Sequence, residues 1–262
     1  MAPPGNMRRA MSDTWFLLLS AALGAGALNA LAGGGSFLTL PALFQAGLPP
    51  IAANATSTVA VSPGYLGSTL GFRAELARMP ARLLWKDSGI CALGGLAGAG
   101  LLLVTPAHLF VAVVPWLLLF ATAVFAAGPW LIRRLKQRAD APAGSAAAWR
   151  RAVGLAAVSV YGGYFNGGLG ILLLALYQAT GVSDLREANA LKNLNSLVLS
   201  AVSVLTFAWA GQVHWPEALG MAVAAIVGGY LGAALTRRLP ASWVRAFVIA
   251  TGLFMAGKFL LR

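Results

Sequence analysis

The chain has 262 residues, of which 59% are hydrophobic and only 10% are charged, and its formal net charge at pH 7 is +12. Soluble domains carry about 25% charged residues, so this composition excludes a soluble globular protein and indicates a polytopic membrane protein. The basic residues stand in short loops between apolar runs, and no long basic stretch is interleaved with stacking aromatics, so nucleic acid is not an expected partner.

Most apolar runs along the chain have the roughly 20 residues that a membrane span needs. Two runs are shorter and directly follow glycine clusters, so we expect half-helices there. The expected runs are 15–32, 37–46, 56–72, 83–104, 109–132, 153–165, 171–180, 191–211, 218–235 and 244–261. They divide the chain into an N-terminal tail (1–13), a first transmembrane repeat (14–132), a basic cytoplasmic linker (133–151) and a second transmembrane repeat (152–262).

Glycine clusters interrupt the apolar pattern at two places, AGGGS at 32–36 and NGGLG at 166–170. Open backbone inside a bilayer is tolerated only where it is buried in protein or lines a cavity. The clusters are followed in the same order by a short apolar run, a glycine and an Asn-Ala pair, with Gly47 matching Gly181 and Asn54 matching Asn189. Such paired breaks in two halves indicate the binding site of a transporter. The alternative is that the glycines only allow close helix packing.

Loop charges favour one of two topologies. If each interrupted segment crosses the membrane fully, the loop with Arg237 and Arg238 falls on the side opposite the other basic loops, against the positive-inside rule. If each segment instead turns at its glycines, the two halves become inverted and the basic loops share one face. We therefore predict an all-α polytopic membrane protein of two inverted repeats, each with a re-entrant, discontinuous helix plus three transmembrane helices, about eight membrane helices in total.

The half-helix that follows each break presents unpaired N–H groups and a partial positive charge to the membrane interior. Such an end binds an anion without a buried cation. Ser36 is expected to cap the first half-helix and to donate a hydroxyl. Asn29 and Asn166 precede the breaks and could hydrogen-bond either the opened backbone or the ligand.

A second polar group follows each half-helix. In the first half it includes Thr56 and Ser57. In the second half a stripe at three- and four-residue spacing is expected on one helix face, formed by Asn189, Lys192, Asn193, Ser196 and Ser200. Lys192 is a candidate cation inside the bundle, although it is close enough to the helix start to snorkel to the interface.

The remaining polar residues suggest no second chemistry. Cys91 is the only cysteine and cannot form an intrachain disulfide, and His108 and His214 stand alone, so no metal site is expected. Glu75, Asp87 and Glu217 are expected at the membrane interface, and the eight tryptophans near span ends. With no Walker motif and no nucleophile–base pair at depth, we expect neither an enzyme nor a cofactor.

In these two glycine clusters and the segments after them, including Ala55-Thr56-Ser57 and Ala190-Leu191-Lys192-Asn193, the chain resembles the TauE/SafE family of sulfite exporters and toluene-sulfonate-uptake permeases. The resemblance covers about residues 15 to 261. It implies a multi-pass transporter of small sulfur-containing anions in the bacterial inner membrane. Leu191 departs from the paired pattern, because the first half has Thr56 there.

The expected function is therefore a secondary transporter that moves sulfite, thiosulfate or an organosulfonate by alternating access, surrounded by membrane lipid. An anion channel on the same fold and a membrane scaffold or assembly protein are the alternatives. A homodimer is left open. The candidate substrate-binding residues are Asn29, Gly34, Gly35, Ser36, Thr56, Ser57, Asn166, Gly168, Gly170, Lys192 and Asn193.

Overall fold

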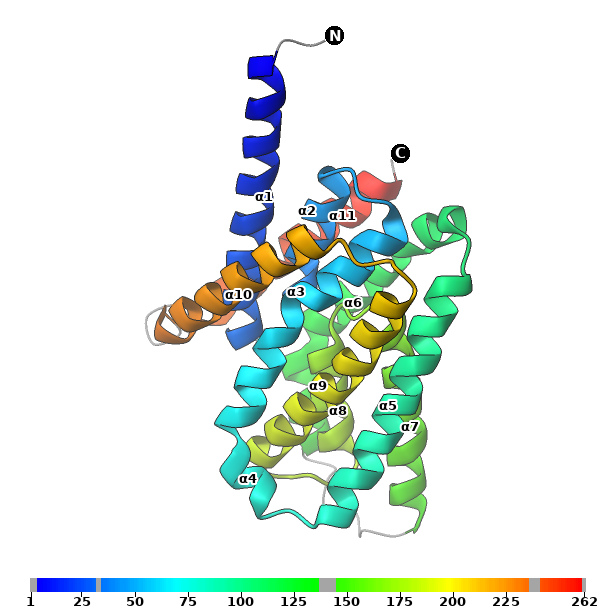
Figure 1. Cartoon of the computed structure of the whole chain (residues 1–262). Helices are drawn as coiled ribbons and strands as arrows, with labels where there is room; N and C mark the ends of the chain where they lie inside the picture. The colour runs from blue at the N-terminus through cyan, green and yellow to red at the C-terminus, as the bar shows by residue number, and fades with distance from the viewer. Residues whose placement is uncertain (1–3, 32–33, 137–144, 236–240, 261–262) are drawn as a thin grey trace.

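The computed structural model describes residues 4–31, 34–136, 145–235 and 241–260, and the regular structure in these ranges is entirely α-helical (Figure 1). The all-α prediction is thereby confirmed. The helices are α1 (Pro4–Leu31), α2 (Ser36–Gln45), α3 (Pro50–Gly71), α4 (Arg73–Ala77), α5 (Ala81–Val104), α6 (Ala107–Lys136), α7 (Ser145–Tyr164), α8 (Leu169–Ala179), α9 (Leu185–Trp209), α10 (Trp215–Leu235) and α11 (Ala241–Leu260). Ala32, Gly33, Arg237 and Arg238, which figured in the sequence predictions, lie outside the described residues.

Short helices follow both glycine breaks, as predicted, but the long helices after them start earlier than their apolar runs. α3 begins at Pro50, since proline at a first helical position has its φ already set for the helix. α9 begins at Leu185 because the Asp184 carboxylate caps it, accepting from the Arg186 N–H at 2.6 Å and the Glu187 N–H at 3.4 Å. The polar groups after the breaks therefore lie well inside helices.

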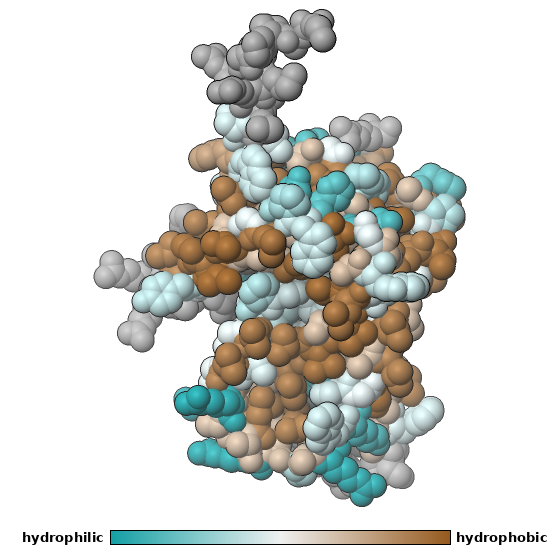
Figure 2. Space-filling model, viewed as in Figure 1, coloured by the Kyte–Doolittle hydropathy of each residue, from teal (hydrophilic) through white to brown (hydrophobic). Residues whose placement is uncertain are grey.

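Several helices have the length and composition of membrane spans. Within the described residues α5, the 107–128 part of α6, and α9 are long and apolar enough to cross a bilayer, and α2 and α8 are apolar but shorter. Figure 2 shows the corresponding surface, a broad hydrophobic band between two ends where hydrophilic residues gather. The number of spans, about eight, stays a prediction.

The two interrupted segments enter the molecule from opposite ends. In Figure 1, α2 returns to the end at which α1 starts, the end where both termini lie. α8 returns to the other end, where α7 starts and where α4 lies. Each short helix also contacts the long helix before it, α2 against α1 and α8 against α7.

Two helix pairs come into backbone contact through glycine. α1 packs along α10, and α5 packs along α7. A Cβ atom at Gly26 or Gly228 would overlap a carbonyl oxygen of the other helix of the first pair, and a Cβ at Gly98 or Gly163 would do so in the second. Small residues allow this close approach, which drives helix association in lipid, where there is little hydrophobic force between helices.

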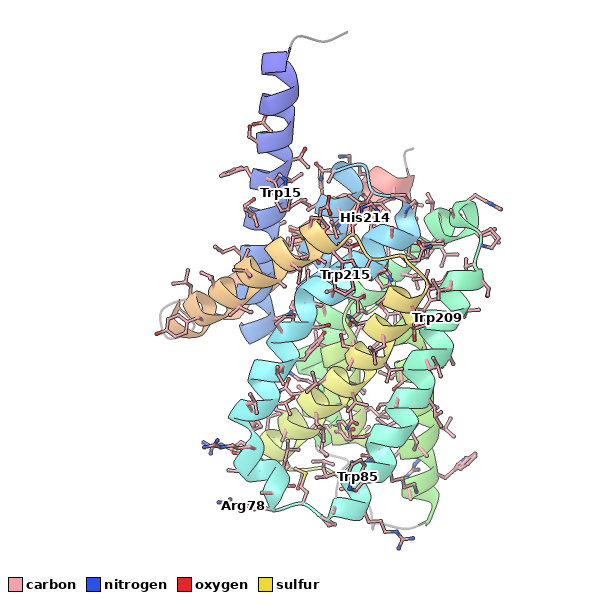
Figure 3. The ribbon with its side chains drawn as sticks, viewed as in Figure 1. Trp15, Arg78, Trp85, Trp209, His214 and Trp215 are labelled. Carbon is pink, nitrogen blue, oxygen red and sulfur yellow. The ribbon has the colours of Figure 1, made fainter. Side chains whose placement is uncertain are left out.

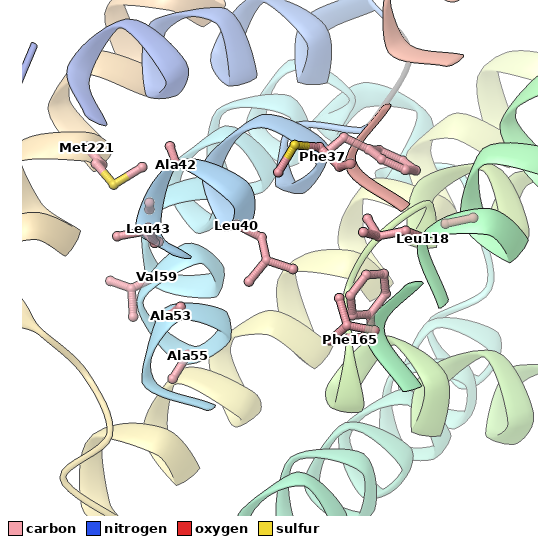
Figure 4. Packing of buried hydrophobic residues seen from close by; sticks show 14 of the residues in the cluster. Phe37, Leu40, Ala42, Leu43, Ala53, Ala55, Val59, Leu118, Phe165 and Met221 are labelled. Atoms are coloured by element: carbon pink, nitrogen blue, oxygen red, sulfur yellow. The ribbon is translucent and has the colours of Figure 1, made fainter. Parts of the chain in front are cut away.

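The core lies between these two pairs and is shared by both halves of the chain. Figure 4 shows Phe37 and Leu40 of α2 close to Leu118 of α6 and to Phe165 beside the second break. α3 crosses α9, where the hydroxyl oxygens of Ser62 and Ser200 are 2.6 Å apart. The interrupted segments are therefore held from both halves.

Candidate functional site

The first break is capped by an asparagine side chain. Asn29 Oδ1 accepts hydrogen bonds from the N–H groups of Gly34 at 3.0 Å and Gly35 at 2.8 Å. Ser36 was expected to cap this half-helix, and that prediction is wrong. Ser36 is the first residue of α2, and the N-cap residue is Gly35, which makes no side-chain capping hydrogen bond. The Asn29 carboxamide fills that role from the preceding helix, and its Nδ2 has no acceptor in the part of the chain that the structure describes.

The second break is built differently. Asn166 and Gly168 both have left-handed backbone, with φ of 59° and 74°. The Gly167 carbonyl accepts from the Tyr161 hydroxyl at 2.6 Å, and Asn166 Oδ1 accepts from the Tyr65 hydroxyl at 3.4 Å. Asn166 is only 3% exposed, and its Nδ2 has no hydrogen-bond partner. An unpaired buried donor of this kind is costly, so it calls for an explanation.

Both breaks lie against the same helix, α6. Phe125 is next to Gly34, and Ala121, one helical turn earlier, is next to Gly168. Phe125 also makes an edge-on ring contact with Phe37 at 6.3 Å. The structure thus brings the two glycine clusters together around one turn of α6, although they are about half a chain apart in sequence.

Thr56 and Ser57 are buried, and both hydroxyls already have partners. The Thr56 hydroxyl oxygen accepts from the backbone N–H of His214 at 3.1 Å, just before α10 starts. The Ser57 hydroxyl lies 2.6 Å from that of Thr39 in α2. These contacts attach α3 to its neighbours and leave the expected role of Thr56 and Ser57 in substrate binding as a prediction.

The polar stripe on α9 divides into buried and partly exposed members. Asn193, Ser196 and Ser200 are buried, and the Ser196 hydroxyl has no partner. Asn189 Nδ2 donates back to the Leu185 carbonyl within the same helix. Lys192 is half-buried and, within the described ranges, its ammonium forms no hydrogen bond or ion pair. It is thus an unneutralised cation beside the buried stripe.

A cavity of about 460 Å³ opens next to Asn29, between α1, α3 and α10. Gly26 and Asn29 line it from α1, Gly64 and Ser68 from α3, and Ile226 and Tyr230 from α10. Of the predicted site residues in the described chain, only Asn29 lines this cavity; the second break, Lys192 and Asn193 do not.

Sequence reasoning missed a buried ion pair. Asp87 was expected at the membrane interface; the structure shows that it is buried within the protein, with only 2% of the residue exposed, and its depth in the membrane stays a prediction. Its carboxylate accepts from Arg151 at 2.5 Å, and the Arg151 guanidinium lies over the Tyr177 ring, 4.8 Å from its centre. Tyr177 in turn accepts from Asn195 Nδ2 at 2.6 Å. An aspartate inside an apolar run was a signal, because such residues are rare in spans and usually paired.

Aromatic and charged residues mark the two ends of the helices. In Figure 3, Arg78 and Trp85 lie at the end where α4 is found, His214 and Trp215 lie nearer the opposite end, and Trp209 lies between the two groups. Trp85 and Trp209 are 79% and 91% exposed. An exposed tryptophan at the end of a helix bundle, such as Trp85, is typical of the membrane–water interface. Within the described residues, no cluster of histidine, cysteine or carboxylate groups could hold a metal ion.

Comparison with known proteins identifies the family of this chain. The family model described as "Sulfite exporter TauE/SafE" matches residues 18–259. The chain is 25% identical over 252 residues to "Probable membrane transporter protein YfcA" of Escherichia coli K12, covering 93% of this chain and 88% of that one. It is 27% identical over 251 residues to a "Probable membrane transporter protein" of Haemophilus influenzae, with 94% of each chain covered. No solved structure matches. The chain is a multi-pass membrane protein that belongs to the TauE/SafE family of transporters, which is not a family of enzymes.

Proposed function

We propose that this protein carries a small sulfur-containing anion, such as sulfite, thiosulfate or an organosulfonate, across the bacterial inner membrane by alternating access. The family description names a sulfite exporter, and the matched relatives are bacterial proteins named as probable membrane transporters. The two glycine breaks add a separate argument, because their hydrogen-bond donors favour an anionic cargo over a cationic one.

The observation that carries the proposal is a matched pair of amide donors. Asn29 and Asn166 stand at the two breaks, and the oxygen of each carboxamide accepts hydrogen bonds from the protein. Among the described residues, Asn166 Nδ2 is buried without a hydrogen-bond partner, and Asn29 lines the open cavity between α1, α3 and α10. Donors without acceptors next to helix N-termini are complementary to an oxyanion and disfavour a cation.

Charges elsewhere in the bundle support this preference. Lys192 supplies an ammonium that is not neutralised by any described carboxylate, while the buried carboxylate of Asp87 is already paired with Arg151. Interior ionisable residues of membrane proteins commonly mark the substrate pathway.

The arrangement of the interrupted segments supports alternating access. The segment formed by α1 and α2 enters from one end, and the segment formed by α7 and α8 enters from the opposite end. Each half also contacts the other through a helix pair, since α1 packs along α10 and α5 packs along α7. In transporters of this kind, one half rocks against the other around a site at the broken helices.

Two isosteric substitutions test the cargo's charge. In Asn29→Asp and Asn166→Asp the oxygen that accepts the observed hydrogen bonds remains, while the free donor is replaced by a negative oxygen. Uptake of radiolabelled sulfite, sulfate, thiosulfate, taurine and sulfoacetate into proteoliposomes is the measurement. We expect each variant to lose about tenfold or more in apparent affinity, the cost of roughly one charge-assisted hydrogen bond.

A matched control is Gln45→Glu, which makes the same amide-to-carboxylate change at the exposed end of α2 and should keep uptake unchanged. Saturable uptake with counterflow would identify a carrier, and conductance far above carrier rates would identify a channel instead. The proposal is wrong if none of these sulfur compounds is taken up or competes while a cation is transported, or if both aspartate variants transport the anion as well as the unchanged protein.

A further inference from the structure

A tyrosine from the first half of the chain contacts the asparagine at the second break. The Tyr65 hydroxyl, on α3, donates to Asn166 Oδ1 at 3.4 Å, although the two residues are 101 positions apart in sequence. Both residues are buried, with 8% of Tyr65 and 3% of Asn166 exposed. The Asn166 carboxamide is therefore held by a helix that is distant from it in sequence.

This hydrogen bond determines which end of the carboxamide stays free. Within the described residues the Tyr65 hydroxyl donates to no other group, and Asn166 Nδ2 is buried without a partner. Turning the amide round would place Nδ2 against the Tyr65 oxygen and would leave both the phenol proton and Oδ1 unpaired. Each unpaired buried polar group costs free energy, so the tyrosine favours the orientation in which only the donor end is free.

Further contacts fix the position of Tyr65 relative to the break. One turn earlier on α3, the Ser62 hydroxyl oxygen lies 2.6 Å from that of Ser200 on α9. Near the start of α3, Asn54 Nδ2 donates at 3.1 Å to the carbonyl of Tyr164, just before the second break. Supporting hydrogen bonds of this kind hold the groups around a binding site in a fixed geometry. α3 is thus attached to the second half of the chain at two further points, which keeps the Tyr65 hydroxyl in place.

We infer that Tyr65 is a positioning residue of the anion site: its hydroxyl holds the Asn166 carboxamide with the donor end free for an oxyanion, and Tyr65 itself does not touch the cargo. The inference rests on the proposed anion transport and deepens it, because it names the residue that gives the second break its preference for negative charge. Without the hydroxyl, the amide can turn and present its oxygen, which accepts hydrogen bonds and repels an anion.

The test removes the hydroxyl and keeps the ring. In Tyr65→Phe we expect a three- to tenfold rise in apparent KM, roughly the effect of losing one neutral hydrogen bond, for those of sulfite, sulfate, thiosulfate and sulfoacetate that are taken up. The maximal rate per folded protein should stay within about twofold, because the hydroxyl acts on binding only. Uptake of the radiolabelled anions into proteoliposomes measures both values.

A double-mutant cycle shows whether Tyr65 acts through Asn166. In an Asn166→Gly background, Tyr65→Phe should change the apparent KM by less than about twofold, since no amide is left to orient. Glycine is chosen because it accepts the left-handed backbone of residue 166, whose φ is 59°. Where a variant no longer transports, calorimetric titration with the same anion gives Kd in place of KM.

Tyr177→Phe is the matched control. It also removes a buried phenol hydroxyl that is hydrogen-bonded to an asparagine, because Asn195 Nδ2 donates to the Tyr177 oxygen at 2.6 Å. Both residues lie within helices, away from the glycine breaks. We expect this variant to unfold at a lower temperature in detergent with an unchanged KM. A purely structural role of Tyr65 predicts that same result for Tyr65→Phe, so the change in KM separates the two roles.

The inference is overturned if Tyr65→Phe leaves KM unchanged, whether or not its melting temperature falls. It is also overturned if Tyr65→Phe raises KM equally in the Asn166→Gly background, because Tyr65 would then act on the cargo directly. A loss of affinity in Asn166→Asp with none in Tyr65→Phe would contradict this inference alone and leave the proposed anion transport standing. If no anion is transported at all, the proposed function fails first, and this inference fails with it.

Discussion

The Arg151 guanidinium donates to the Asp87 carboxylate at 2.5 Å, and only 3% of the Asp87 side chain and 13% of the Arg151 side chain are exposed. The pair joins α5 to α7 and, through the Tyr177 ring, to α8. Removing one partner of a buried pair leaves an uncompensated charge, which costs about 3–5 kcal/mol. The single variants Asp87→Asn and Arg151→Gln should therefore unfold at clearly lower temperatures in detergent.

The double variant Asp87→Asn/Arg151→Gln should recover much of that loss, since it removes both charges. Arg150→Gln is the internal control, because Arg150 is the exposed neighbour of Arg151. Equal melting temperatures for Arg150→Gln and Arg151→Gln would show that the ion pair contributes nothing to stability.

Close helix packing predicts opposite results at two glycines of one helix. A Cβ at Gly98 would overlap the Val160 carbonyl oxygen on α7, so Gly98→Ala should destabilise the protein by about 1–3 kcal/mol. Gly100 has nothing within 4 Å, and Gly100→Ala should be neutral or stabilise by up to about 1 kcal/mol through helix propensity. Thermal unfolding in detergent compares them, and a loss at both positions would refute the packing argument.

Alanine substitutions at two glycines with left-handed backbone distinguish the effect of backbone strain from the effect of site geometry on transport. Gly168 and Gly181 have φ of 74° and 96°, so alanine at either position should cost about 1–2 kcal/mol of stability. Only Gly168 lies at the second break, where an added Cβ would come within 3.3 Å of Ala121; at Gly181 nothing lies within 4 Å. We expect anion uptake to fall in Gly168→Ala alone, at matched amounts of folded protein. Equal loss of uptake in both variants would mean that strain, not the site, limits transport.

The half-helices were predictable because a short apolar run after a glycine cluster has few other interpretations in a membrane protein. The start of α9 could also have been predicted, because Asp184 followed three residues later by Glu187 resembles a capping box. The apolar pattern alone placed the start at residue 191. From the sequence, Asn29 could hydrogen-bond either the opened backbone or a ligand. In the structure, its Oδ1 accepts a hydrogen bond from the backbone at the break.

Other features depend on which helices become neighbours, which hydropathy does not encode. Asp87 and Arg151 are 64 residues apart, and Arg151 was expected in a loop because its neighbours in sequence are basic. The cavity beside Gly64 depends on the placement of α1 and α10 against α3, and no local pattern distinguishes that glycine from those that pack against backbone.

Removing the charge of Lys192 should raise the stability of the protein and weaken anion transport. Its ammonium is half-buried on α9 beside the buried Asn193 and Ser196 and, among the described residues, has no carboxylate partner. Burying a charge without a partner is unfavourable, so Lys192→Met should raise the melting temperature, while Lys192→Arg keeps the charge. If the ammonium attracts the anion, Lys192→Met should lower the apparent affinity by about tenfold or more, and Lys192→Arg should retain most of it. Lys86→Met, at an exposed position of α5, controls for the loss of a positive charge on the protein as a whole. A Lys192→Met protein that is more stable and transports the anion with unchanged affinity would place Lys192 outside the pathway, as an interfacial lysine.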